Sequence, residues 1–299
     1  MVCSQLLLNA YVQRARLVEL PAAARPATPQ EAYQCQALFV EKLGRTIGYK
    51  IACTNAIAQR FLNMPEPFYG RLLAPSTFDS PARLAAGAFF MRVIESEFAF
   101  QFARDLPPMA GPLDREQIAD ALAGLLPGIE IVDSRFTSWT TVGAPSLIAD
   151  NACHGAWVKG ALITDWRHLD LAAQAVELRL NGSVVQRGSG SAVLGHPLNA
   201  LEWLVHRLHA QGIGLKAGEY VTTGVTTDIY DAKPGDDGVR TRVPHRQRPS
   251  SRRAVGAGRS ALELKFDGAH GPEVRDQVVA RFRVVNVRGH PSGHVFASL

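Results

Sequence analysis

The sequence predicts an α+β fold. Helical patterns cluster early in the chain, and strand-like runs dominate later. The sequence does not show the regular alternation of strands and helices that is typical of a doubly wound parallel sheet. With 299 residues, of which 46% are hydrophobic, the chain can bury one large core or two small ones.

Four segments carry helical signals. The leucines of residues 1–20 recur at helical spacing and predict an amphipathic helix. The other three segments, which have recognisable start or stop signals, are residues 27–44, 113–127 and 197–212. Gly212 closes the last of them, at a position where a left-handed residue often ends a helix.

The starts of two of these helices follow capping preferences. Thr28 stands at an N-cap, with Pro29 at the first helical position and Glu31 at the third, as in a capping box. Asp114 and Gln117 have the same spacing at the start of the next helix. We therefore expect helices that begin close to Pro29 and Asp114.

Strand-like runs make up much of the remaining sequence. The stretch 175–188 alternates around Asn181-Gly182, which is a strong signal for a β-hairpin. Further short runs rich in β-branched residues lie at 128–136, 155–164, 219–230 and 276–289.

The formal net charge of +5 has a local origin. Seven arginines and no acidic residue lie between Gly238 and Leu262, and without them 25 basic residues face 27 acidic ones. No aromatic residues are interleaved with these arginines, so we expect no nucleic-acid partner. The segment lacks helical and strand periodicity. We interpret residues 237–262 as an irregular region, either a disordered insertion or a reading-frame anomaly of a GC-rich gene.

Cellular location is predicted from what the sequence lacks. No run approaches the ~20 apolar residues of a membrane-spanning helix, so we expect no membrane partner. The apolar patch near the start is too short and too soon interrupted for a signal peptide. The cysteines are scattered without a CxxC pair, and we expect a cytoplasmic protein with reduced thiols at Cys3, Cys35, Cys53 and Cys153.

Two glutamates in the strand-like run VIESEFAF (93–100) point to a candidate site. Glu95 and Glu97 are two residues apart, so in a strand their side chains share one face. Buried carboxylates side by side repel each other, and a divalent cation such as Mg²⁺ or Mn²⁺ relieves that repulsion. The alternative is that Glu95 and Glu97 simply lie on a solvent-exposed face of the sheet and bind no metal.

A third carboxylate for such a site comes from the run GIEIVDSRF. It contains Glu130 and Asp133, which face opposite sides of a regular strand because their numbers differ by three. Glu130 lies between two isoleucines, as an inward-facing residue does. We therefore expect Glu130 to join the metal site.

These motifs, with others in the same order, resemble the group of 2-keto-4-pentenoate hydratases and 2-oxo-enedioate decarboxylases in the fumarylacetoacetate hydrolase family. The resemblance covers about residues 5–236. The stretches that carry it are GYKIACTN (48–55), PFYGRLL (67–73), VIESEFAFQFARDLP (93–107), IEIVDSRF (129–136), PSLIADNACHGAWVKG (145–160), VLGHPLNALEWLVHRL (193–208) and GIGLKAGEYVTTGVTTDIYDAKPGD (212–236).

The resemblance implies a metal site and a catalytic lysine. Glu95, Glu97 and Glu130 would bind one Mg²⁺ or Mn²⁺, and Lys50 of the GxK motif would lie at the rim of the metal pocket. We expect the nearby cation to lower the pKa of Lys50, so that this residue acts as acid and base. A surface lysine at a strand end is the alternative.

Other candidate residues have alternative structural roles. His154 either relays a proton or donates to substrate, or it is a structural histidine. Cys153 is expected to be a small buried residue rather than a nucleophile. Arg71 would bind a substrate carboxylate, unless it is simply exposed. Thr223 is placed at the pocket rim as a substrate-binding residue, with packing as the alternative.

The resemblance also implies a β-roll or sandwich core with helices packed outside, within one domain. Residues 1–80 would form a mostly helical N-terminal part, and residues 81–236 a metal-binding, β-rich catalytic core. The Arg-rich region 237–262 would follow, and then a strand-like tail over 263–299.

The implied activity is hydration of a 2-hydroxy-2,4-dienoate to a 4-hydroxy-2-oxo acid by a cytoplasmic homo-oligomer in aromatic catabolism. The same metal chemistry serves a 2-oxo-enedioate decarboxylase, so the three glutamates do not separate the two activities. An acylpyruvate-type C–C hydrolase would use a histidine–carboxylate pair. A non-catalytic binding protein is the alternative from another class.

Overall fold

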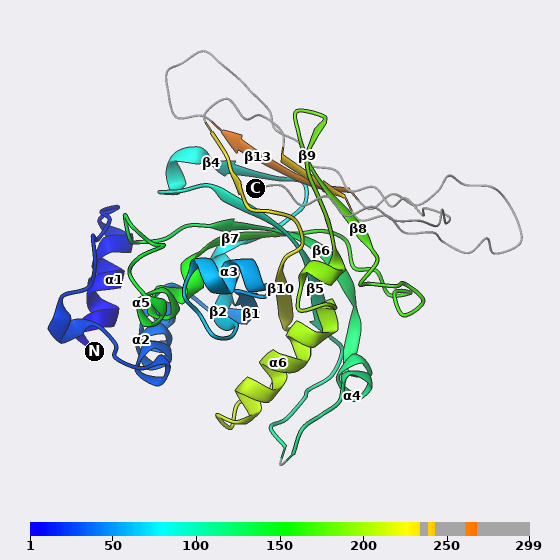
Figure 1. The fold of residues 1–299 in the computed structure, drawn as a ribbon, viewed down its shortest axis with the longest axis horizontal. Coiled ribbons are helices and arrows are strands. Elements are labelled where there is room, and N and C mark those ends of the chain that lie inside the picture. Colours follow the sequence, from blue (N-terminus) through cyan, green and yellow to red (C-terminus); the bar gives the residue numbers. More distant parts are fainter. Residues whose placement is uncertain (110, 234–238, 243–260, 268–299) are drawn as a thin grey trace, which may run out of the picture.

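The computed structural model describes residues 1–109, 111–233, 239–242 and 261–267. These residues form two β-sheets with helices packed around them (Figure 1). No helix in these ranges is long and apolar enough to cross a membrane. The predicted strand-like run at 276–289 lies outside the described residues.

The larger sheet carries the candidate site residues of the sequence analysis. Seven of its strands follow the order β2-β1-β10-β5-β6-β7-β3, and the short β11 also pairs with β5. Most neighbours are antiparallel, but β1 is parallel to β10 and β3 is parallel to β7. Its strands are β1 (Thr46–Ala52), β2 (Phe68–Leu73), β3 (Thr77–Asp79), β5 (Val93–Phe102), β6 (Leu122–Val132), β7 (His154–Lys159), β10 (Tyr220–Val225) and β11 (Tyr230–Asp231).

The smaller sheet has the order β4-β13-β12-β8-β9. The predicted hairpin is confirmed: Asn181 and Gly182 both adopt positive φ between β8 and β9. The interpretation of 237–262 as irregular is wrong for six of its residues, because Val239–Arg242 form β12, and Ala261 and Leu262 begin β13, which pairs with β12. The strands are β4 (Ala82–Ala85), β8 (Ala175–Leu180), β9 (Ser183–Ser189), β12 (Val239–Arg242) and β13 (Ala261–Asp267).

The predicted N-terminal helices are present, but residues 1–80 also supply three strands of the larger sheet. Thr28 caps its helix by accepting a hydrogen bond from the backbone of Glu31, and the Glu31 side chain in turn accepts from Ala27 N–H. Helices α1, α2 and α5 gather on one side of the molecule, away from α4 and α6 (Figure 1). The helices are α1 (Val2–Val12), α2 (Pro29–Glu41), α3 (Ala56–Phe61), α4 (Arg115–Ala119), α5 (Ala144–Ala149) and α6 (Pro197–His209).

The predicted helix over residues 113–127 is much shorter in the structure. Its capping box between Asp114 and Gln117 is present, but α4 ends at Ala119 and β6 starts at Leu122. The apolar residues of β6 are buried on both faces of the sheet, with Ile129 in one cluster and Leu126 in another. A continuous apolar run of this kind does not distinguish a strand from a helix.

The main core lies between one face of the larger sheet, the smaller sheet and α6. Phe98, Ile129 and Val221 of the larger sheet belong to the same buried cluster as Leu178 and Leu204. The opposite face of the larger sheet buries a smaller group, Leu72, Ala99, Leu126 and Trp157. This second face carries the site described below.

The prediction that all four cysteines are reduced is wrong for one pair in this structure. Cys3 of α1 and Cys35 of α2 form a disulfide, with their Cα atoms 6.1 Å apart. Their helices pack side by side in a separate apolar cluster, which brings the two thiols together. Cys53 and Cys153 are free and buried.

Candidate metal centre

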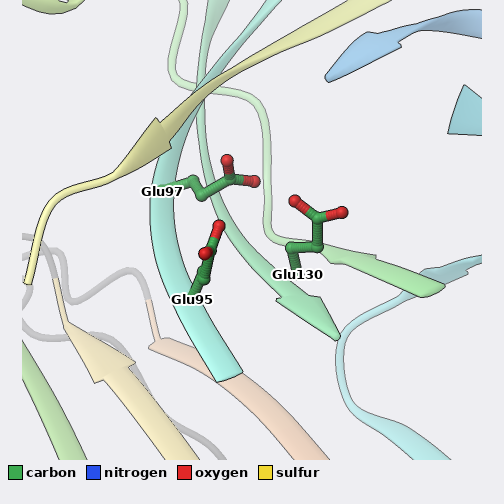
Figure 2. A group of neighbouring side chains, drawn as sticks. All are labelled: Glu95, Glu97 and Glu130. Atoms are coloured by element: carbon green, nitrogen blue, oxygen red, sulfur yellow. The ribbon is translucent and has the colours of Figure 1, made fainter. Parts of the chain in front are cut away.

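Three carboxylates meet on the face of the larger sheet that lies opposite the main core. Glu95 and Glu97 alternate along β5, and Glu130 of β6 stands directly opposite Glu95 in the antiparallel register. One oxygen from each lies within 4.8 Å of the others, and Figure 2 shows the carboxylates directed into one space. Asp133 lies beyond the end of β6, where it accepts a hydrogen bond from Met91 N–H. The choice of Glu130 over Asp133 therefore agrees with the geometry.

The surroundings of these carboxylates fit a cation. Glu97 and Glu130 are buried, and Glu95 is half-buried. Glu97 Oε1 accepts a hydrogen bond from Gly224 N–H at 2.9 Å, but the second oxygens of Glu97 and Glu130 have no hydrogen-bond partner among the described residues. Buried carboxylate oxygens without partners are costly. A hard divalent cation bound by oxygen ligands removes that cost.

The proton affinities of the carboxylates support the same conclusion. Burial raises the pKa of Glu95 to about 7, although the charge of Lys50 opposes this shift. Burial raises the pKa of Glu97 well above its ordinary value, and the negative charges of Glu130 and Glu95 raise it further. Without a cation, the cluster therefore retains protons that ordinary carboxyl groups release below pH 5.

Lys50 extends from β1 to Glu130. Its Nζ lies 2.9 Å from Glu130 Oε1 and donates to the Ala152 carbonyl, also at 2.9 Å. The predicted position at the rim of the pocket is wrong, because Lys50 is only 1% exposed. Burial lowers the pKa of Lys50, but the charges of Glu130, Glu95 and Glu97 raise it more. In the protein without a cation, the Lys50 pKa is therefore raised rather than lowered.

His154 touches Glu130 from the other side. Its Nδ1 lies 3.1 Å from Glu130 Oε1, and its Nε2 lies 3.2 Å from Ser76 Oγ. Burial lowers the pKa of His154, so the ring is neutral near pH 7. A neutral ring that donates from Nδ1 to the carboxylate accepts from the Ser76 hydroxyl at Nε2. His154 therefore orients Glu130, and both of its nitrogens are engaged.

Cys153 is buried beside His154, in agreement with the prediction. Burial raises the pKa of its thiol to about 12, which leaves almost no thiolate at neutral pH. Its position therefore suits a small packed residue and not a nucleophile.

Arg71 and Thr223 are not brought to the carboxylates. Arg71 is the partner of Tyr49 in the register of β1 and β2, whereas Lys50 is the partner of Gly70, so Arg71 and Lys50 point to opposite faces. The hydroxyl of Thr223 donates to the carbonyl of Phe98 at 3.0 Å, in the interior of the sheet. The prediction that these two residues contact substrate gains no support from their positions.

Sequence reasoning missed three groups that contact the site. They are the Ser76 hydroxyl, the Gly224 N–H and the Ala152 carbonyl, and two of the three belong to the backbone. Backbone groups leave almost no signal in a sequence. The single hint is Gly224, whose φ of 96° suits glycine.

A family model described as Fumarylacetoacetate (FAA) hydrolase C-terminal matches residues 59–255, which is more than half of the chain. The chain belongs to this family, as its motifs indicated, and the predicted α+β fold of this type is confirmed.

Its curated relatives include two named hydratases. The 2-hydroxyhexa-2,4-dienoate hydratase of Comamonas testosteroni is 39% identical over 196 residues, which cover 64% of this chain and 72% of the relative. The 2-keto-4-pentenoate hydratase of Paraburkholderia xenovorans (strain LB400) is 31% identical over 210 residues, with 69% and 77% covered.

A solved structure shares the fold. The 4-oxalocrotonate decarboxylase from Pseudomonas putida G7, complexed with magnesium and adipate, superposes with a TM-score of 0.77 over 89% of this chain and 96% of that chain. Its sequence identity is 22%, so this likeness establishes the architecture alone.

Proposed function

We propose that the chain is a divalent-metal-dependent hydro-lyase that adds water to a 2-hydroxy-2,4-dienoate and yields a 4-hydroxy-2-oxo acid. The observation that carries the proposal is the cluster of Glu95, Glu97 and Glu130 with Lys50 bound against it. It occurs in a chain whose relatives at 31% and 39% identity are named as hydratases of such compounds. Aromatic catabolism is the metabolic setting that those names suggest.

The three glutamates would hold one Mg²⁺ or Mn²⁺. When bound, such an ion acts as a Lewis acid toward the oxygens of a 2-oxo acid. Gly224 N–H fixes one oxygen of Glu97, and His154 together with Lys50 fixes one oxygen of Glu130. The two remaining oxygens without partners are available as ligands.

Lys50 would hold and move the proton in this reaction. Its ammonium uses two of three N–H groups, on Ala152 and Glu130. The third has no hydrogen-bond acceptor among the described residues and can donate to substrate. Its raised pKa depends on the negative charges of the glutamates. Once ligation neutralises those charges, burial remains and lowers the Lys50 pKa, which brings Nζ closer to the range of a general acid and base.

The His154–Glu130 contact is a histidine–carboxylate pair, and such a pair would serve a second candidate function, the hydrolysis of a C–C bond in an acylpyruvate. That reaction requires a base that takes a proton from water. His154 has no free nitrogen for this in the structure, because Glu130 and Ser76 occupy both. Hydration therefore remains the better-supported activity.

Product analysis with and without Mg²⁺ tests the proposal. Incubation with 2-hydroxypenta-2,4-dienoate should give a 4-hydroxy-2-oxo acid, and chelation of the metal should abolish the product. Release of CO₂ from oxalocrotonate without hydration of the dienoate would identify a decarboxylase instead. Cleavage of an acylpyruvate into two acids would identify a hydrolase.

The proposal includes a cytoplasmic homo-oligomer, as the sequence analysis expected. Light scattering coupled to size exclusion tests the assembly, and a mass equal to 32.4 kDa would contradict it. Fractionation of the source cells tests the location.

A further inference from the structure

A turn with unusual backbone angles lies behind Lys50. Asn151, Ala152 and Cys153 have φ values of 52°, 51° and 58°, so three consecutive non-glycine residues are left-handed. Asparagine tolerates this region, but alanine and cysteine are unfavourable there. Such a run persists only where its surroundings hold it in place.

The Asn151 side chain fastens this turn to β2. Its Oδ1 accepts from Arg71 N–H at 2.7 Å, and its Nδ2 donates to the Arg71 carbonyl at 3.0 Å. The amide thus pairs with both backbone groups of one strand residue, as a neighbouring strand would. Gly70 allows the close approach, because a Cβ there would lie 2.5 Å from the Asn151 carbonyl oxygen.

The residue before the turn fastens its other end. Asp150 accepts from Ser134 Oγ at 2.8 Å and from Arg135 N–H at 3.0 Å, and it forms a buried ion pair with the Arg135 side chain. The turn is therefore held both to β2 and to the segment that follows β6.

The held turn fixes the direction in which the Ala152 carbonyl points. The Ala152 carbonyl accepts from Lys50 Nζ at 2.9 Å, and Glu130 is the only other acceptor within hydrogen-bond distance of that ammonium among the described residues. A carbonyl's direction follows the backbone angles of its residue. A relaxed turn would point it elsewhere and leave Lys50 with the carboxylate alone.

We propose that Asn151 is a positioning residue that acts through Lys50: it holds the left-handed turn whose Ala152 carbonyl places the Lys50 ammonium beside the metal-binding glutamates. The expected effect on turnover rests on the proposed function, whereas the expected effect on the position of the Lys50 ammonium does not.

The test uses Asn151→Gly in the full-length protein. Glycine tolerates the left-handed conformation, so this change removes the two side-chain hydrogen bonds and keeps the backbone preference. The matched control is Asn181→Gly, because Asn181 has a φ of 49° in the exposed turn between β8 and β9. If Asn151→Gly does not fold, Asn151→Asp replaces it, since aspartate keeps the acceptor for Arg71 N–H, loses the donor and places a negative charge against the Arg71 carbonyl.

The first readout is the NMR signal of the Lys50 ammonium, assigned by its loss in Lys50→Met. It should shift or vanish in Asn151→Gly and stay in place in Asn181→Gly. An unchanged signal in Asn151→Gly would overturn the proposal whatever reaction the enzyme catalyses.

The second readout is Mn²⁺ affinity measured by calorimetry. An ammonium beside the glutamates opposes a second cation, so its displacement should leave Mn²⁺ binding equal to or tighter than that of the parent. Weaker binding would mean that the turn supports the whole site rather than Lys50, and would contradict the proposal.

The third readout is turnover in a double-mutant cycle. Asn151→Gly should lower kcat by roughly 10-fold or more, since a displacement of about 1 Å in a catalytic group can cost 10²-fold. In the Lys50→Met background it should cause no further loss, whereas additive losses would show that Asn151 does not act through Lys50. If the parent has no hydratase activity, the proposed function fails, and the first two readouts still decide the role of Asn151.

Discussion

Lys50 and Glu130 form a buried ion pair between strands that are not neighbours. Nζ and Oε1 are 2.9 Å apart, and the side chains are 2% and 1% exposed. Two strands, β10 and β5, lie between β1 and β6, which would separate the outer pair by roughly 14 Å in a flat sheet. The contact therefore requires a curled sheet, whose concave face gathers residues from distant strands.

Replacing Lys50 with methionine should separate catalysis from metal binding. Turnover of a 2-hydroxydienoate should fall by roughly 10²–10⁴, the usual contribution of general acid–base catalysis. Mn²⁺ affinity should rise, because a neighbouring positive charge is removed. Steady-state kinetics and calorimetry on the same preparation check both. Parent-like turnover would assign the proton transfer to another residue.

The same substitution should destabilise the metal-free protein. Loss of one partner leaves Glu130 buried without its cation, and breaking such a pair typically costs about 3–5 kcal/mol of unfolding free energy. Saturating Mg²⁺ should recover much of this loss, since the ion replaces the ammonium as the counter-charge. Urea unfolding with and without Mg²⁺ measures the difference, and equal losses in both conditions would argue against a metal at Glu130.

The raised pKa of Glu95 predicts how stability depends on pH. Glu95 has a pKa of about 7 in the folded protein and an ordinary value of 4.5 when unfolded, so the folded state binds the proton more tightly. The stabilising contribution is complete below pH 4.5 and is lost as pH rises through 7. Its size is on the order of 3 kcal/mol at most, from the difference between these two pKa values.

Glu95→Gln is the control for this pH dependence, because glutamine has a similar shape and does not titrate. The metal-free parent should lose stability relative to Glu95→Gln between pH 4.5 and 7, as followed by urea unfolding at a series of pH values. Two parallel curves would show that the Glu95 carboxyl is not perturbed. Mg²⁺ should stabilise the parent more at pH 7.5 than at pH 5, because ligands must lose their protons to bind.

Sequence reasoning predicted which three glutamates meet in the structure because their signal is local. Glu95 and Glu97 share a face by the period of two, and Glu130 was preferred over Asp133 because it lies between two isoleucines. The depth of Lys50 was not predictable in this way, because it results from the curl of the sheet and from a turn about 100 residues later. The face on which Arg71 lies was not predictable for a related reason, since it depends on the strand register with β1.

The buried pair of Arg135 and Asp150 predicts a large stability effect. Arg135→Met removes a guanidinium whose side chain is 3% exposed and leaves the Asp150 carboxylate without its counter-charge. The free energy of unfolding should fall by about 3–5 kcal/mol. The additional change Asp150→Asn should restore part of it, because the amide carries no charge. Urea denaturation of the single and double variants checks this, and a double variant less stable than the single one would contradict it.

Gly224 offers a test of how Glu97 is held. Its N–H donates to Glu97 Oε1, its φ is 96°, and a Cβ there would lie 2.1 Å from Thr54 Oγ1. Gly224→Ala should therefore displace the backbone beside Glu97 and weaken Mn²⁺ binding by roughly 10-fold or more, as expected when a partner that orients a metal ligand is lost.

Gly218→Ala is the matched control, because Gly218 has a φ of 84° and a Cβ added there would meet no atom within 4 Å. It carries the backbone strain without the collision, so it should lower stability and leave Mn²⁺ affinity unchanged. Calorimetric titration of both variants decides the matter: equal affinities would show that the Gly224 hydrogen bond does not position Glu97 for a metal.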